Sequence, residues 1–502
     1  MLRRILRRAP LCAVGWIAAA ALLSAGCAST LQSRRQTDRA TYAAYLHGLI
    51  AERDADFPEA LDAYRSALVL DKGSPRLYVR LGGTYVKLGQ MDKALEQFER
   101  ALALDPDYPD ALRWVAMLRT SQGQLGEAVA AYERLLELQP DDRFVLSTLA
   151  DLFILQDESA RAIALYERLI RRFGSSSPVH FNLGVLYARM ERYDEAIQEL
   201  SRALELAPES LEVRVAFGLT YEMAQRFDAA AAHYEAAIQL DPFNPRLYHY
   251  AARALMSAGD YGAARANYGT ALDLAPHDLE AIMGLVRIAM AQQRYDEAEA
   301  LLAKKLEELG HPAELYVALG LVYREAEQAM EAMRAFERAV AQKDTYAQAH
   351  FYLAAQLDQL GREDAARAAL RRTLALEPDH ADALNYLGYL DAEAGVNLLE
   401  AKTLIERALA LDPENGAYID SLGWVYYRMG QIDEAIRYLE RAASHADDPV
   451  IFEHLGDAYA RRQDWERAKH SWERALELDP DQPAVHEKLE QLHPHAATVP
   501  SP

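Results

Sequence analysis

Cysteine is scarce in this 502-residue chain, which has only two, Cys12 and Cys27. Both precede residue 41, so the chain's own cysteines cannot build a disulfide framework, a metal cluster or a thiol nucleophile within residues 41–502. A body without cysteine is also compatible with an oxidising compartment. Glycine and proline are modest, at 25 and 20 residues, which excludes a collagen-like or low-complexity chain.

Positive charge is in deficit, because 54 Lys and Arg stand against 76 Asp and Glu and leave a net charge of −22. Most of such a surface repels a phosphate backbone, so nucleic acid is not expected as a ligand. Two explanations of the excess stay open: solubility of a chain with much exposed surface, and attraction of basic partners.

Motifs of catalysis are missing as well. The sequence has no Gly-rich phosphate loop, no G-x-S-x-G and no H-E-x-x-H. Its 14 histidines are scattered, and His445, His454 and His470 lack a metal-ligand spacing. We therefore expect a protein that is not an enzyme and that needs no cofactor, metal or small-molecule substrate.

The first 26 residues have the order of an export signal. Residues 1–8 carry four arginines and no acid, and residues 9–26 are apolar and uncharged. An uncleaved anchor is the alternative, because about 18 apolar residues are just enough to span a bilayer.

Small residues precede Cys27 in the run Leu22-Leu23-Ser24-Ala25-Gly26-Cys27. This run resembles the lipobox of bacterial lipoproteins, although Ser24 stands where that family has an aliphatic residue. The resemblance implies removal of residues 1–26, a diacylglycerol group on Cys27, and a polar tether over 27–40. Because Ala28 is not an aspartate, it also implies an outer-membrane lipoprotein that faces the periplasm of a Gram-negative bacterium.

A 34-residue period dominates the rest of the chain. Residues 75–108 have Tyr78, Leu81, Gly82, Tyr85, Ala94, Phe98, Ala101 and Pro106 at the eight defining places of a repeat, and in this they resemble the tetratricopeptide-repeat family. In the same register, repeats begin at residues 41, 75, 109, 143, 177, 211, 245, 279, 313, 347, 381, 416 and 449. The extra residue of the repeat at 381 is expected in the turn over 395–397.

The small and large places of the repeat predict how it packs. The eighth place is Gly or Ala in twelve repeats and Val286 in the other, and the twentieth is alanine in all thirteen. Aromatic residues at the twenty-fourth place are expected to pack into the next repeat: Tyr64, Phe98, Tyr132, Tyr166, Tyr234, Tyr268, Phe336 and Trp472.

The resemblance implies an all-α fold, a right-handed α-solenoid of about thirteen helix pairs over residues 41–482. A capping helix is expected over 483–493, followed by a disordered tail over 494–502.

In this family the first helix of each repeat lines a concave groove through its second, fifth, ninth, twelfth and thirteenth places. Applied to repeats seven, eight and ten to thirteen, with their sixth-place neighbours, this rule gives a candidate groove of His249, Tyr250, Arg253, Arg287, Phe351, Tyr352, Asn385, Tyr386, Tyr389, Asp420, Trp424, Tyr427 and Arg428. Aromatic residues and Arg dominate interface hot spots, so a protein or peptide partner is predicted. The alternative is that several of these rings pack between helices. The Lys/Asn carboxylate clamp of chaperone-binding members is not reproduced.

The sequence thus predicts a protein-binding scaffold tethered in the cell envelope. Residues 382–480, which include DALNYLGYL at 382–390, further resemble lipoproteins that recruit cell-wall hydrolases to a carboxyl-terminal processing protease. The resemblance implies a protease adaptor. An assembly factor for pili, exopolysaccharide or outer-membrane proteins is the main alternative, and an enzyme is a distant one.

Overall fold

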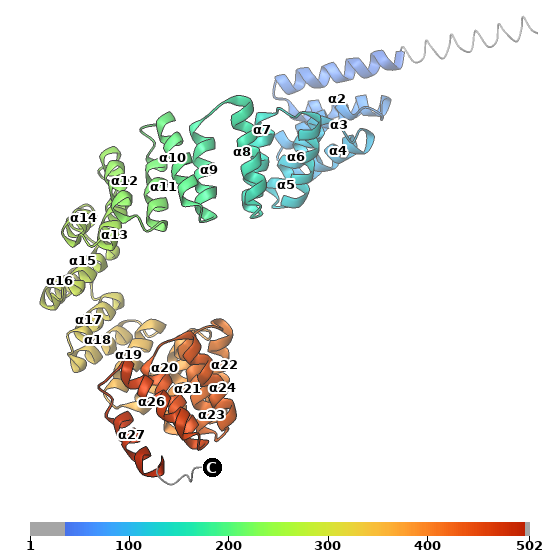
Figure 1. Ribbon diagram of the computed structural model, residues 1–502. Coiled ribbons are helices and arrows are strands. Elements are labelled where there is room, and N and C mark those ends of the chain that lie inside the picture. Colours follow the sequence, from blue (N-terminus) through green and yellow to red (C-terminus); the bar gives the residue numbers. More distant parts are fainter. Residues whose placement is uncertain (1–35, 497–502) are drawn as a thin grey trace, which may run out of the picture. The chain divides into compact units, whose positions relative to one another are not determined.

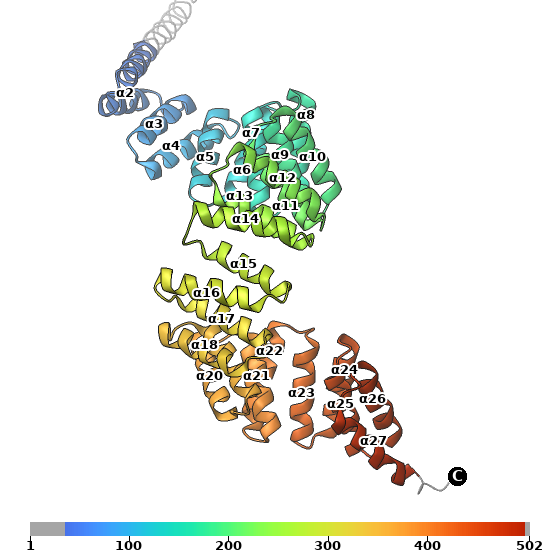
Figure 2. The same ribbon diagram turned by 90° about the vertical axis from the view of Figure 1, so that its left-hand side faces the viewer.

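The computed structural model describes residues 36–496, and every regular element among them is a helix. The predicted signal peptide, Cys27 and residues 28–35 of the tether lie outside the described residues, as do residues 497–502 of the predicted tail. The chain forms two compact units, of which the first ends at Leu240 and the second begins at Asp241. Figures 1 and 2 show each unit as a series of stacked helix pairs.

In the first unit, a helix over 36–53 is followed by α2 (Phe57–Leu70), α3 (Pro75–Lys87), α4 (Met91–Leu104), α5 (Pro109–Ser121), α6 (Leu125–Leu138), α7 (Arg143–Leu155), α8 (Ser159–Phe173), α9 (Ser177–Arg189), α10 (Tyr193–Leu206), α11 (Leu211–Met223) and α12 (Phe227–Leu240). The helix over 36–53 includes the last five residues of the predicted tether. Within this helix, the Thr41 hydroxyl donates to the Thr37 carbonyl one turn earlier at 3.0 Å.

The second unit contains α13 (Pro245–Ser257), α14 (Tyr261–Leu274), α15 (Leu279–Ala291), α16 (Tyr295–Leu309), α17 (Ala313–Glu325), α18 (Ala329–Gln342), α19 (Ala347–Gln359), α20 (Glu363–Leu376), α21 (Ala381–Ala394), α22 (Leu398–Leu411), α23 (Gly416–Arg428), α24 (Ile432–His445), α25 (Pro449–Arg461), α26 (Trp465–Leu478) and α27 (Pro483–Ala496). Helix α27 extends over 494–496, which the sequence assigned to the tail.

The pair α3–α4 shows how the sequence produces a hairpin. Pro75 occupies the first turn of α3, where a missing backbone N–H costs no helical hydrogen bond. Gly89 turns the chain toward α4 with a φ of 72°, a conformation that a side chain would disfavour. Ala94, Phe98 and Ala101 are fully buried on α4. A Cβ added at Gly82 would lie 2.6 Å from the ring of Phe98, so the two helices touch because Gly82 has no side chain.

The same contact pattern recurs along both units. Large, fully buried aromatic side chains lie on the second helices of their pairs, as the repeat pattern predicts: Tyr64, Phe98, Tyr132, Tyr166, Tyr234, Tyr268 and Phe336. Within each unit, second helices also contact the first helix of the next pair, as α4 contacts α5 and α24 contacts α25. The prediction of an all-α solenoid of helix pairs is confirmed.

The pair α21–α22 has a longer turn. Helix α21 ends in Gly395 with a φ of 68°, and Asn397, with a φ of 49°, precedes α22. Asn397 is held there because its amide donates to the buried carboxylate of Asp391 at 3.3 Å.

No helix within residues 36–496 combines the length and the apolar character that a membrane crossing requires.

Candidate protein-interaction surfaces

First helices of neighbouring pairs touch one another along much of the second unit. In the second unit, α13, α15, α17 and α19 are in contact in series, and α21, α23 and α25 are as well. We call this set the first-helix face of the second unit. All thirteen residues of the predicted groove lie on its helices.

On α13 the predicted residues divide between inside and outside. His249 is buried, with Nε2 3.0 Å from the Asp278 carboxylate and Nδ1 3.1 Å from the Glu280 carboxylate. The ring therefore lies between α13 and the carboxylates at the start of α15. Tyr250 is half-buried with the Arg253 guanidinium 5.5 Å from its ring centre, while Arg287 of α15 is exposed.

A cluster of half-buried rings lies on α19 and α21. The ring of Phe351 is 5.9 Å from that of Tyr352 and 6.4 Å from that of Tyr386. The Tyr386 hydroxyl donates to the Asp358 carboxylate at 2.7 Å, and this bond joins α21 to α19. Asn385 is half-buried, and its side-chain oxygen has no hydrogen-bond partner. These residues are accessible in part and can also stabilise the face on which they lie.

A second cluster lies on α23 and α25. Trp424 is only 7% exposed, because its indole stacks on the His454 ring at 4.0 Å and on the Tyr427 ring at 4.7 Å. Its Nε1 donates to the Glu393 carboxylate at 2.6 Å. Asp420 is buried as well and accepts a hydrogen bond from His454 Nδ1 at 3.0 Å. Trp424 and Asp420 thus pack between helices, which was the alternative interpretation of the pattern.

What remains accessible around this cluster is a rim of rings and cations. Tyr427 is half-buried beneath the Arg461 guanidinium, which is 5.6 Å from its ring centre. Arg428 is half-buried 5.9 Å from the Trp424 ring centre. Tyr389 is half-buried too, and burial together with the charges of nearby carboxylates raises the pKa of its phenol. The rim therefore offers neutral rings and permanent cations to a partner.

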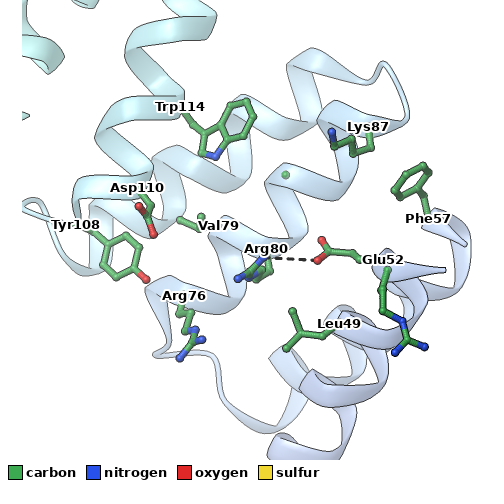
Figure 3. Close-up of a pocket in the computed structure, with 12 residues that line it drawn as sticks. Leu49, Glu52, Phe57, Arg76, Val79, Arg80, Lys87, Tyr108, Asp110 and Trp114 are labelled. Carbon is green, nitrogen blue, oxygen red and sulfur yellow. Dashed lines mark ion pairs between the residues drawn. The ribbon is translucent and has the colours of Figure 1, made fainter. Parts of the chain in front are cut away.

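A cavity also lies in the first unit, away from the predicted groove. It has a volume of about 730 Å³ between the helix over 36–53, α3 and α5, and Phe57 of α2 also reaches it (Figure 3). Its lining residues are Leu49, Glu52, Arg53, Phe57, Arg76, Val79, Arg80, Gly83, Lys87, Tyr108, Asp110 and Trp114. Such a volume is within the usual range of ligand sites.

The sequence analysis missed this cavity although the signal was available. Most of its lining stands at the second, fifth, ninth, twelfth and thirteenth places of the first three repeats, as Arg76, Val79 and Lys87 do in the repeat that starts at 75. The predicted groove covers only repeats seven, eight and ten to thirteen. Applied to the first three repeats, the rule would have found this site.

No group of three or more His, Cys, Asp and Glu side chains within residues 36–496 is arranged to hold a metal ion.

Comparison with known protein families gives one consistent description. Models described as tetratricopeptide repeat match residues 79–143, 176–242, 255–319, 356–416, 416–444 and 450–482, which together span more than half of the chain. A TPR repeat-containing protein of Pseudomonas aeruginosa is 41% identical over 88 residues, or 18% of this chain. The match spans 15% of that curated relative's length.

Solved structures similar to this one include a chain of the APC/C hetero-tetramer Cut9–Hcn1, with a TM-score of 0.43 and 15% identity over 90% of this chain and 96% of that one. Yeast Tom70 aligns with a TM-score of 0.41 and 19% identity over 90% of this chain and 99% of that one.

Proposed function

The chain belongs to the tetratricopeptide-repeat family, and from this premise we propose that it is a non-catalytic scaffold that holds a protein partner against its first-helix faces. The observation that carries the proposal is the 730 Å³ cavity, which three successive first helices line with aromatic rings and basic side chains. Aromatic residues and Arg are the types that dominate protein interfaces. The accessible rim of Tyr427, Arg428 and Arg461 in the second unit has the same composition.

The proposed place of action is the periplasmic side of the outer membrane. This part of the proposal rests on the sequence around Cys27, where a basic start, an apolar stretch and small residues before the cysteine favour lipidation. A lipid tether raises the effective concentration of a bound partner at the membrane without requiring tight binding in the groove.

The more specific role that we propose is that of an adaptor, which brings cell-wall hydrolases to a carboxyl-terminal processing protease. Its support is the similarity of residues 382–480 to lipoproteins of that kind.

A crosslinked pull-down of the lipidated protein from cell envelopes tests the place and the role together. The captured proteins are identified by mass spectrometry, with Cys27→Ser as the control that removes the lipid site. Joint capture of a periplasmic protease and cell-wall hydrolases is expected for the adaptor. Capture of pilus, polysaccharide or outer-membrane assembly components would instead assign the scaffold to assembly.

Substitutions at the rim residues test whether the second unit takes part in binding the partner. Arg428→Ala combined with Arg461→Ala is expected to weaken partner capture and to leave helical content unchanged, because both side chains are accessible in part or in full. Arg334→Ala combined with Arg338→Ala on α18 is the matched control, since it removes two exposed arginines from a second helix. Trp424→Ala is unsuitable, because truncation of a buried Trp costs about 3–5 kcal/mol of stability and would confuse binding with folding.

A further inference from the structure

The cavity of the first unit is basic in a strongly acidic chain. Four of its lining residues are cations, Arg53, Arg76, Arg80 and Lys87, and two are carboxylates, Glu52 and Asp110. The chain as a whole carries a net charge of −22. A concentration of positive charge in a hollow attracts anionic groups and repels the basic ones that most of the surface attracts.

Contacts within the cavity leave part of this charge available. Glu52 is engaged on the wall, where its carboxylate lies 3.7 Å from the Arg80 guanidinium and accepts a hydrogen bond from the Thr84 hydroxyl at 3.0 Å. Arg53 lies 3.0 Å from the carboxylate of its neighbour Asp54. The other two cations, Arg76 and Lys87, are exposed at the ends of α3. Arg76 is held in place by the ring of Tyr45, whose centre is 5.0 Å from its guanidinium.

Apolar groups lie between these two cations. Val79 of α3 and Leu49 of the helix over 36–53 line the cavity, and Trp114 of α5 reaches it from the other side (Figure 3). The Trp114 indole is fixed because it stacks on the buried Phe98 ring with centres 5.5 Å apart and planes within 2°. A rigid ring beside aliphatic side chains is suited to an apolar residue of a partner.

We propose that this cavity binds an acidic segment of the partner protein, with carboxylates at Arg76 and Lys87 and an apolar side chain against Trp114. This inference rests on the proposed function, of which it names the partner's chemistry at one site. A bilayer with anionic headgroups is disfavoured, because the basic residues line a hollow between helices and share it with apolar groups. Arg76 and Lys87 stand at opposite ends of the 13-residue α3, roughly 16–17 Å apart along the axis at a rise of about 1.5 Å per residue. An extended segment of about five to six residues spans that length.

Binding of a defined peptide to the full chain tests the proposal. The probe is a fluorescein-labelled 12-residue peptide with glutamates around one Leu and one Phe, amidated so that it has no terminal carboxylate. The comparison peptide has glutamine at every glutamate position. Fluorescence anisotropy is expected to show about tenfold tighter binding of the glutamate peptide at low salt, because two exposed ion pairs contribute up to about fivefold each. The difference should shrink as NaCl shortens the screening length.

Two variants with the same change in net charge then test whether the peptide binds in the cavity. Arg76→Glu with Lys87→Glu reverses the two cavity cations. Lys72→Glu with Arg100→Glu makes the same change in net charge at exposed positions outside the cavity lining. About tenfold weaker binding is expected for the first variant, and wild-type binding for the second. Equal loss in both, or equal affinity for the two peptides, overturns the proposal.

Two further arms separate the competing explanations. Displacement of the peptide by anionic vesicles, but not by neutral ones, would assign the cavity to a membrane and overturn the peptide proposal. Envelope pull-downs with the Arg76→Glu, Lys87→Glu variant separate the two proposals: unchanged capture of the partner without peptide binding sinks the cavity proposal and leaves the scaffold standing. Specific peptide binding by a chain that captures no partner supports the cavity and removes the scaffold function.

Discussion

Gly82 and Gly83 are adjacent on α3, but their surroundings differ completely. A Cβ at Gly82 would meet the Phe98 ring at 2.6 Å, whereas a Cβ at Gly83 would meet nothing within 4 Å. We expect Gly82→Ala to lower stability by about 1–3 kcal/mol through overpacking. Gly83→Ala should be neutral or raise stability by about 0.5–1 kcal/mol, because alanine favours the helix. Urea unfolding followed by circular dichroism measures both, and equal midpoints for the two variants would contradict this account of the packing.

His454 gives the second unit a pH-dependent contribution to stability. Burial alone would lower its pKa, but the charge and hydrogen bond of Asp420, with smaller effects of Asp457 and Glu453, outweigh burial and raise it. A raised folded-state pKa stabilises the fold below the unfolded value of about 6.5, and this contribution is lost as pH rises through the folded value.

Replacing His454 with glutamine removes the titratable ring, so the stability of the His454→Gln variant is compared with that of the wild type. The free energy of unfolding of the wild type should exceed that of the variant most strongly below about pH 6.5, and the difference should narrow as the pH rises through the raised pKa of His454. Urea midpoints measured across this range provide the test. A gap that is constant with pH would mean that His454 contributes by packing against Trp424 and not by its charge.

For single residues, the sequence predicts the helix on which a residue lies better than it predicts whether the side chain packs in the core or binds a partner. The repeat register put Tyr427 and Trp424 on the same first helix, three positions apart, and both are there. It could not show that the Trp424 indole turns inward to His454 and Glu393, because a ring can pack or bind at the same place. The choice depends on partners that lie about 30 residues away along the chain.

At the scale of elements, α27 covers the C-terminal end of the second unit. Its Val485 is fully buried and Leu492 nearly so. Lys488 joins it to α25, with Nζ 2.7 Å from the carboxylates of both Glu453 and Asp457. Burial would lower the pKa of Lys488, but these two hydrogen bonds outweigh burial and raise it. Terminal elements of this kind protect the apolar face of the last repeat.

Deletion of residues 483–502 is therefore expected to destabilise the end of the second unit. Each fully buried aliphatic side chain that is lost removes about 1.5–3 kcal/mol, and the underlying face of α25 and α26 becomes exposed. Hydrogen exchange should become faster in α25 and α26. Deletion of 497–502 alone leaves α27 whole and is the control. Unchanged exchange after the longer deletion would show that α27 is dispensable for the stack.

The cavity also shows what the periodic pattern can and cannot predict at this scale. The family rule names the places that face inward, and those places line the cavity at Arg76, Val79 and Lys87. The rule does not say which repeats open a hollow between their helices, because that depends on how three helices diverge. The first repeat also departs from the pattern, with His47 and Lys72 at places usually held by leucine and proline.

For the whole molecule, the fold class followed from the sequence because each repeat packs only on its neighbours. First helices begin at Pro75, Pro109 and Arg143, and this spacing of 34 residues persists to Ala347. Local packing rules are then enough to predict the stack. The same locality limits the prediction of units, because the 34-residue spacing continues unchanged across the division at Leu240.

Because each pair packs only on its neighbours, the destabilising effect of a substitution should stay close to its site. A Cβ at Gly423 would lie 2.7 Å from Leu439, so Gly423→Ala should loosen the pair α23–α24. In a chain of nearest-neighbour contacts the effect should fade over the adjoining pairs. Hydrogen exchange should therefore rise in α21–α26 and stay unchanged in α3–α6. Gly269→Ala, where a Cβ meets nothing within 4 Å, is the control in the same unit. Faster exchange throughout the chain would mean that the molecule unfolds as one cooperative body, and two separately stable units would then be the wrong description.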